Sequence, residues 1–212
     1  MVKAIIFDLW DTLAYHEHKC LPDLLREKIC PDKSHYEFNE ILEKTIQIKD
    51  WDSLQDMYTY LLHYLKIKPD DKLLKELIKI TGHCLDNVGL FPETVEVLQK
   101  LKQKYKLALI SNTFSFSLHR LGNGFEKYFD CVCYSYKVGV AKPDLRIFNI
   151  ALAKLGVKPS EAVMVGDSMR VDITPALEVG MHAVLIDRKG RFDVTNKITS
   201  LNELFDSIEK LY

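Results

Sequence analysis

Acidic residues follow several apolar runs of this sequence, and their types could support metal-assisted nucleophilic chemistry. The acidic set comprises Asp8, Asp167 and Asp172. Like charges that lie close together must be neutralised by protonation or by a cation. Oxygen ligands with room for water molecules suit Mg²⁺. If folding brings the three aspartates together, we therefore expect them to hold a magnesium ion.

Small polar and basic residues near the same runs could complete such a site. Ser111 and Asn112 follow one apolar run, and Lys142 lies in the segment GVAKPD. Their hydroxyl, amide and ammonium groups are donors for an anionic group such as phosphate. A carboxylate beside Mg²⁺ and these donors could attack phosphorus, form an aspartyl-phosphate and be released by water. Mg²⁺ and Lys142 would spread the charge on the transferred group.

The apolar runs that precede these residues predict the strands of a buried parallel sheet. Each run is short and apolar on both faces, as expected for a strand that helices cover. Segments with helical periodicity separate the last four runs, and this alternation predicts a doubly wound α/β fold. The carboxyl ends of such strands converge on one crevice, where residues far apart in the sequence can meet. The five runs are residues 2–7, 107–110, 131–134, 162–165 and 182–186.

Each polar residue also has a simpler interpretation when it is taken alone. Asp8, Ser111 and Asn112 could belong to turns. Lys142 could be a plain surface charge, and Asp172 could favour the start of a helix through its dipole. We favour the catalytic interpretation because all four polar segments follow consecutive buried strands in order.

Residues 15–89 break the alternation of strands and helices. They carry four helical patterns and no convincing strand. We expect them to form a small all-helical cap domain, inserted after the first strand and placed over the active edge. Residues 1–14 and 90–212 would then form the α/β core, with hinges near 14–18 and 87–92. The alternative is that these helices simply cover the sheet.

Several residues of the expected cap could contact a substrate. His16, His18 and Lys19 follow the first strand closely and could face the crevice. A solvated hinge is the simpler interpretation, because histidines at positions i and i+2 diverge on a helix and no third metal ligand is evident. Arg26 and Trp51 could also reach the substrate, although a helix-surface charge and a core aromatic residue are the simpler interpretations.

Composition and charge exclude several classes of protein. The 212 residues include 29 Lys and Arg against 30 Asp and Glu, so the chain has no broad basic face for nucleic acid. No apolar run approaches the ~20 residues that span a bilayer, and acidic residues interrupt the N-terminus before a signal peptide could form. Five cysteines without a CxxC pair predict neither a disulfide framework nor a zinc site. We expect a cytoplasmic protein that acts on a small anionic molecule.

Four segments resemble the motifs of the haloacid dehalogenase superfamily of hydrolases. In chain order they are FDLWDTL, LALISN, GVAKPDLRIF and GDSMRVDITPALEVGM. The match extends over nearly the whole chain, because residues 15–89 are similar in size and position to the type-1 cap of that superfamily. The resemblance implies a core sheet covered by helices and a mobile cap that closes over the substrate.

The resemblance also implies a role for each candidate residue. Asp8 would be the nucleophile. Mg²⁺ would be held by Asp8, the main-chain carbonyl of Trp10 and Asp167, and Asp172 would lie close to it. The residues that would hold the transferred group are Thr12, Ser111, Asn112 and Lys142.

One position departs from the pattern of the superfamily's phosphatases. They usually carry a second aspartate two residues after the nucleophile, which protonates the leaving oxygen and later activates water; here that residue is Trp10. An indole cannot do acid–base chemistry near neutral pH, and such assistance is worth about 10²–10⁴ in rate. Asp11 lies one residue too late, although a cap histidine that reached the leaving group could replace the acid. Phosphatase activity could therefore be slow or limited to good leaving groups.

Trp10 leaves three functions open. The 2-haloacid dehalogenases are similar at this position, where they have Tyr, and halide leaves without a proton. They replace the acid of the fourth motif and need no metal, whereas this chain keeps Asp167. A scaffold or regulator without catalysis is the third alternative, which the complete set of Asp8, Lys142 and Asp167 opposes. We favour a Mg²⁺-dependent phosphatase of a small phosphorylated metabolite, and neither the substrate nor the oligomeric state follows from the sequence.

Overall fold

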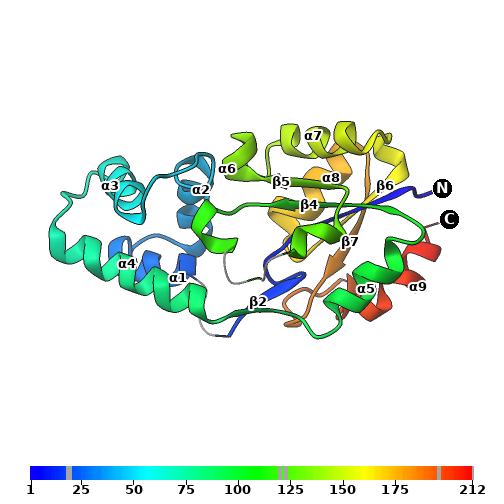
Figure 1. Ribbon diagram of the computed structural model, residues 1–212, viewed down its shortest axis with the longest axis horizontal. Coiled ribbons are helices and arrows are strands. Elements are labelled where there is room, and N and C mark those ends of the chain that lie inside the picture. The colour runs from blue at the N-terminus through cyan, green and yellow to red at the C-terminus, as the bar shows by residue number, and fades with distance from the viewer. Residues whose placement is uncertain (18–20, 119–120, 122–123, 195–196, 212) are drawn as a thin grey trace.

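The structure is a computed structural model of the chain, and it describes residues 1–17, 21–118, 121, 124–194 and 197–211. Its central feature is a six-stranded sheet with the order β5-β4-β1-β6-β7-β8, in which neighbouring strands are parallel (Figure 1). This arrangement confirms the expected α/β fold with a parallel sheet. The strands are β1 (Ala4–Phe7), β4 (Lys106–Ser111), β5 (Cys131–Tyr134), β6 (Ala162–Gly166), β7 (His182–Ile186) and β8 (Lys197–Ile198).

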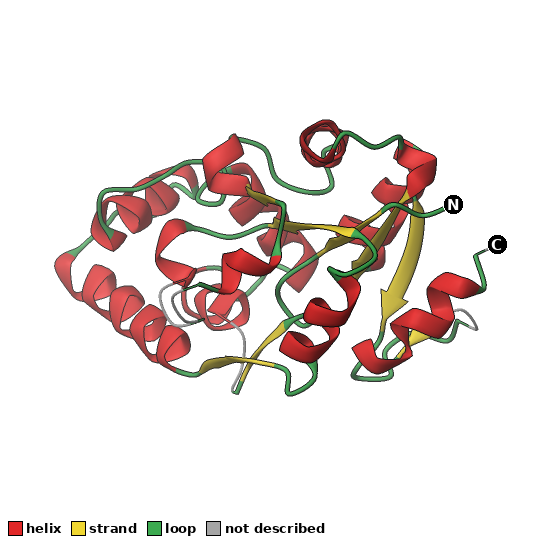
Figure 2. Ribbon diagram, turned by 45° about the vertical axis from the view of Figure 1, so that its right-hand side comes forward, coloured by secondary structure: helices red, strands yellow, loops and turns green. Residues whose placement is uncertain are grey.

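Helices cover both faces of the sheet because the central strands are apolar on both sides (Figure 2). Successive side chains of a strand point to opposite faces. Ile5 and Phe7 of β1 pack in one apolar cluster with α5 and α9, and Ala4 and Ile6 pack in a second cluster with α7 and α8. The helices of this part are α5 (Thr94–Leu101), α6 (Ser135–Val138), α7 (Leu145–Leu155), α8 (Thr174–Val179) and α9 (Leu204–Glu209). Short helical turns occupy Ser115–Leu118, Phe125–Tyr128, Pro159–Glu161, Met169–Ile173 and Leu201–Glu203.

Four helices in residues 21–86, here called the helical segment, pack around an apolar cluster of their own, on the left in Figure 1. Ser34, Ser53 and Asp70 cap three of these helices by accepting hydrogen bonds from main-chain amides. Phe114, from the loop after β4, also belongs to the cluster and so joins the helical segment to the sheet. The helices are α1 (Leu21–Ile29), α2 (His35–Lys44), α3 (Leu54–Tyr64) and α4 (Asp71–Asp86). Within the described ranges, no helix combines the length and apolar character that crossing a membrane requires.

Two short strands contradict the expectation that residues 15–89 contain no strand. β2 (Ala14–His16) and β3 (Val88–Leu90) pair antiparallel where the chain enters and leaves the helical segment. Each has three residues, too few to show the alternation that identifies a strand in a sequence. Their pairing arises because the two passing segments lie side by side, and the expectation is therefore wrong at both ends of the region.

Candidate active site

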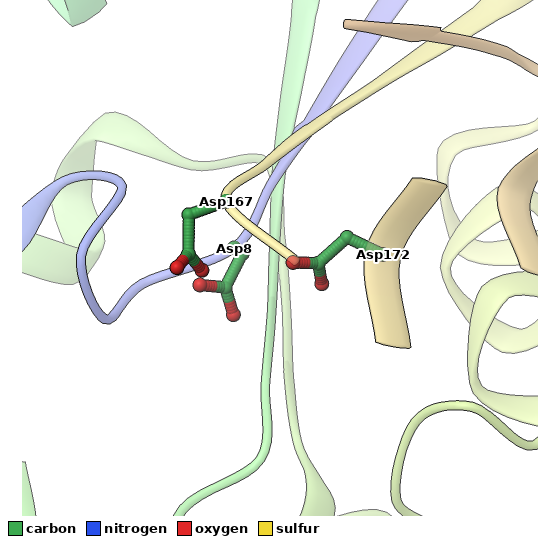
Figure 3. A group of neighbouring side chains, drawn as sticks. All are labelled: Asp8, Asp167 and Asp172. Atoms are coloured by element: carbon green, nitrogen blue, oxygen red, sulfur yellow. The ribbon is translucent and has the colours of Figure 1, made fainter. Parts of the chain in front are cut away.

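Three aspartates meet at the carboxyl ends of the two central strands. Asp8 follows β1, Asp167 follows β6, and Asp172 lies in the helical turn after it. One carboxylate oxygen of each lies within 4.8 Å of those of the other two, and the three carboxyl groups point toward one another (Figure 3). The parallel register places Phe7 opposite Val165, which brings the residues that follow them together. The predicted acidic residues are therefore neighbours in space.

Lys142 bridges two of these carboxylates. Its Nζ atom donates hydrogen bonds to Asp8 Oδ1 and Asp172 Oδ1, each at 2.5 Å, and its side chain is 1% exposed. Burial alone lowers the pKa of Lys142, but Asp172 and Asp8 outweigh burial and raise it. The ammonium group therefore stays charged inside the protein. The other oxygen of Asp172 accepts a hydrogen bond from the Ser168 amide at 3.0 Å.

When all three carboxylates are ionised, the negative charges of this cluster exceed the positive charges that contact them. Burial, together with the neighbouring Asp172, raises the pKa of Asp8 to about 8 and that of Asp167 to about 6. Lys142 supplies one positive charge, and Arg191, which donates to Asp167 Oδ2 at 2.7 Å, supplies a second, against three carboxylates. A divalent cation would supply the rest, and carboxylate oxygens are the ligands that Mg²⁺ prefers. The residues present thus fit a magnesium ion.

The polar residues predicted to hold the transferred group lie in different environments. Asn112 directs its amide to the main chain of Lys142, donating to the carbonyl and accepting from the amide, both at 2.7 Å. Thr12 and Ser111 are fully buried behind the cavity wall, and neither hydroxyl has a hydrogen-bond partner in the part of the chain that the structure describes. Asn112 therefore lines the cavity and binds the main chain of Lys142.

A cavity of about 1110 Å³ separates the acidic cluster from the helical segment. Asp8, Lys142 and Asp167 line it on the side of the sheet, and residues of α1 and α2 line the opposite side. Glu43 of α2 joins the two sides, because its carboxylate accepts hydrogen bonds from both terminal nitrogens of Arg170. A small molecule in this cavity would contact the sheet and the helical segment together.

Comparison with known proteins identifies the family. A model of haloacid dehalogenase-like hydrolases matches residues 2–180. The chain belongs to this family of hydrolases. Two glyceraldehyde 3-phosphate phosphatases, from Methanothermobacter thermautotrophicus and Methanocaldococcus jannaschii, are each 34% identical to this hydrolase. The alignments cover 88% and 100% of this chain and 86% and 99% of the relatives.

One solved structure supports the same family, and a second shares the fold. A phosphatase from Thermococcus onnurineus is 28% identical to this hydrolase, with a TM-score of 0.64 over 98% of each chain. A 2-haloacid dehalogenase from Pseudomonas syringae is 24% identical, with a TM-score of 0.67 over 100% of each chain, and shows the shared fold alone. The resemblance drawn from the four motifs is thereby confirmed at the level of the superfamily.

Trp10 lines the cavity of this hydrolase and stacks on His16, with ring centroids 4.6 Å apart and an interplanar angle of 22°. Burial lowers the pKa of His16. Asp11 follows with φ at 57°, in the left-handed region that glycine adopts most easily and aspartate tolerates. This backbone turns the Asp11 carboxylate toward Lys189, whose Nζ lies 2.9 Å from Oδ2. Asp11 therefore lines the cavity and forms an ion pair with Lys189.

Two further cap candidates, Arg26 and Trp51, do not line the cavity. Arg26 donates to a main-chain carbonyl of its own helical segment at 3.1 Å. Trp51 is 9% exposed and donates its Nε1–H to another such carbonyl at 3.0 Å. Trp51 is thus a core aromatic residue, whereas Arg26 is partly buried and is not a plain helix-surface charge. His18 and Lys19 lie outside the described residues.

A basic loop beside the site was missed by the sequence analysis. The segment DRKGR directly follows β7, and three of its side chains contact the segments that carry Thr12, Asp11 and Asp167. A signal was present, because this segment follows the fifth apolar run just as the other polar segments follow theirs. The segment was missed because it is basic, whereas the residues that indicated a metal site are acidic.

Gly166, the last residue of β6, leaves no room for a side chain. A Cβ atom built on it would overlap the carboxyl group of Asp172. We therefore expect Gly166→Ala to displace Asp172 and to weaken Mg²⁺ binding by about 10–100-fold, the usual cost of disturbing a metal site's surroundings. Titration calorimetry checks this value. Gly82→Ala in α4, where no atom lies within 4 Å of the added Cβ, is the matched control, and equal affinities for the two variants would contradict the prediction.

Proposed function

We propose that this hydrolase is a Mg²⁺-dependent phosphatase that acts on a small phosphorylated metabolite through an aspartyl-phosphate on Asp8. The observation that carries the proposal is the buried Lys142, which contacts both Asp8 and Asp172 beside Asp167 at a cavity. This arrangement combines a nucleophile with positive charge for a phosphoryl group. The relatives named glyceraldehyde 3-phosphate phosphatase support the same chemistry and make that ester the first candidate substrate.

In the proposed reaction, Asp8 attacks phosphorus, the bond between phosphorus and the ester oxygen breaks, and water then hydrolyses the aspartyl-phosphate to phosphate. Lys142 holds Asp8 Oδ1 at 2.5 Å, which orients the carboxylate and favours its charged form. The same ammonium stabilises the negative charge of the transferred group. Asp8, Asp167 and the main-chain carbonyl of Trp10 would hold Mg²⁺, with Asp172 close to it. The bound ion supplies positive charge to the transition state.

The remaining candidate residues complete this proposal. Thr12 and Ser111 would support the transferred group, and Asn112 would act through the main chain of Lys142. Residues 1–14 and 90–212 would form the core, and residues 15–89 would form a type-1 cap that moves over the cavity. The apolar cluster within the helical segment supports this division.

Because of Trp10, we expect the rate of hydrolysis to depend strongly on the leaving group of the substrate. Since the indole cannot donate a proton near neutral pH, the leaving oxygen must depart as an anion or take its proton from water. We expect alkyl phosphates to be hydrolysed about 10²–10⁴-fold more slowly than aryl phosphates of low leaving-group pKa, because that is the usual contribution of a general acid. Equal rates for the two classes, measured at saturation, would show that another group supplies the proton.

Aryl phosphate hydrolysis with Mg²⁺ and with a chelator tests the proposed function directly. Turnover that depends on Mg²⁺ is the expected result. No turnover at high enzyme concentration would overturn the proposal. Chelator-insensitive release of halide from 2-chloropropionate would then support the dehalogenase that the aromatic Trp10 suggests, and binding of a phosphate analogue without turnover would support a scaffold.

A further inference from the structure

The loop after β7 is anchored by a completely buried carboxylate. Asp187 accepts hydrogen bonds from the main-chain amides of Arg191 and Phe192 at 2.8 and 2.9 Å. Lys197 Nζ contacts the same carboxylate at 2.7 Å. Burial alone raises the pKa of Asp187, but these donors outweigh burial and lower it. Gly190, at φ 64°, completes the turn, so the backbone of the loop is held from inside the protein.

Arg188 connects this loop to the segment that follows the nucleophile. One terminal nitrogen of its guanidinium donates to the Thr12 carbonyl at 2.8 Å, and the other donates to Glu93 Oε1 at 2.8 Å. The guanidinium also lies 3.5 Å from the ring centroid of Phe91. The side chain is 13% exposed. Arg188 thus fixes the turn after β1 to the chain that leaves the helical segment.

Arg191 connects the same loop to the metal-site acid. One nitrogen of its guanidinium donates to Asp167 Oδ2 at 2.7 Å and to the main-chain carbonyl of Asp167 at 3.0 Å. A donor that contacts the side chain and the main chain of one residue restricts the rotation of that side chain. Lys189, between the two arginines, contacts Asp11. The three cations therefore contact the two segments that carry Asp8 and Asp167.

We propose that the loop formed by residues 187–192 is a positioning element of the active site. Arg188 holds the turn after the nucleophile, and Arg191 holds the carboxylate of Asp167 for the metal ion. Asp187 fixes the backbone of the loop and so the positions of both arginines. The part that concerns the metal ion rests on the proposed function. The proposal does not require any of these side chains to contact the reacting atoms, because their hydrogen bonds go to protein groups.

Mg²⁺ affinity, measured by titration calorimetry without substrate, tests the role of Arg191. We expect Arg191→Gln to weaken binding by about 10–100-fold, as for other partners that orient a metal ligand. Arg191→Lys should behave like Arg191→Gln, because an ammonium on a flexible stem does not keep the fixed direction of the planar guanidinium. If Arg191 were instead a cation that competes with Mg²⁺, Gln would tighten binding and Lys would match the wild type. Either tightening or no change overturns the proposal.

Steady-state kinetics test the role of Arg188. We expect Arg188→Gln to lower kcat by roughly 10²-fold, the cost of a misplaced reacting group, while the Mg²⁺ affinity stays within about twofold of the wild type. Arg188→Lys should not rescue kcat, because it loses the stacking and one of the two contacts. An unchanged kcat, or a loss of Mg²⁺ affinity equal to that of Arg191→Gln, would contradict separate positioning roles.

Asp187→Asn tests whether the loop acts as one unit, and it should lower both kcat and Mg²⁺ affinity. A normal value for either quantity in the folded variant would show that the two arginines act independently of the anchor; should this variant fail to fold, the arginine variants still decide the proposal. Arg146→Gln, which removes an exposed ion pair with Asp144 on α7, is the control. Wild-type protein that binds no Mg²⁺ would overturn the proposed metal site, whereas Mg²⁺ binding that Arg191→Gln leaves unchanged would overturn the loop proposal alone.

Discussion

Asp8→Asn should abolish turnover of an aryl phosphate while leaving the protein folded. An amide is not a nucleophile toward phosphorus, and the loss of a covalent nucleophile costs about 10⁴–10⁶ in kcat. The substitution keeps the volume of the side chain and removes a carboxyl group whose ionisation burial already opposes. Lys142 keeps its contact with Asp172. Steady-state kinetics and thermal unfolding together check both halves of this expectation.

The matched control for this substitution is Asp52→Asn, which alters an exposed aspartate of the helical segment. It should leave kcat and KM at wild-type values. Retention of more than about a hundredth of the activity in Asp8→Asn would show that another group attacks phosphorus, since general acid–base assistance alone accounts for only about 10²–10⁴ in rate. The comparison therefore separates the nucleophile from carboxylates that merely lie on the surface.

Lys142→Met should impair both stability and catalysis. It removes the cation that contacts Asp8 and Asp172 and leaves their buried carboxylates without that charge partner. Breaking one side of a buried ion pair costs about 3–5 kcal/mol of stability. Loss of the charge that faces the transferred group should also lower kcat by about 10²–10³-fold. Urea unfolding without metal and steady-state kinetics with Mg²⁺ measure the two effects.

Lys104→Met, at an exposed position after α5, is the control for the loss of a lysine charge. Its free energy of unfolding and its kcat should match the wild type. Added Mg²⁺ should recover part of the stability of Lys142→Met, because an ion that binds only the folded state stabilises it. Unchanged stability in Lys142→Met without metal would mean that the carboxylates take up protons at little cost, and the charge balance described for the cluster would then be wrong.

Patterns that repeat along the chain were sufficient to predict the main elements. All five apolar runs are strands of the sheet, because a strand buried on both faces must be apolar throughout and is therefore visible in the sequence. β2, β3 and β8 were not visible in this way. They have two or three residues each, and they pair because other parts of the fold bring their backbones together.

The polar contacts of the site were harder to predict than its acidic residues. Asp8, Asp167 and Asp172 could be singled out because each lies at or near the end of a predicted strand. The sequence contains no sign that Asn112 bonds to the main chain of Lys142, or that Asp11 pairs with Lys189. These partners are 30 and 178 residues apart, and their pairing depends on side-chain directions after the sheet has formed.

The sequence by itself determined the α/β class, the five apolar strands, and the acidic residues at or near their ends. These features depend on hydrophobic periodicity and on residues close together along the chain. Only the tertiary structure decided which charges neutralise one another: Lys142 between two aspartates, and Arg188 and Arg191 on the loop of Asp187. The physical reason is that buried charges need partners within hydrogen-bond distance, and packing of the whole chain sets those distances.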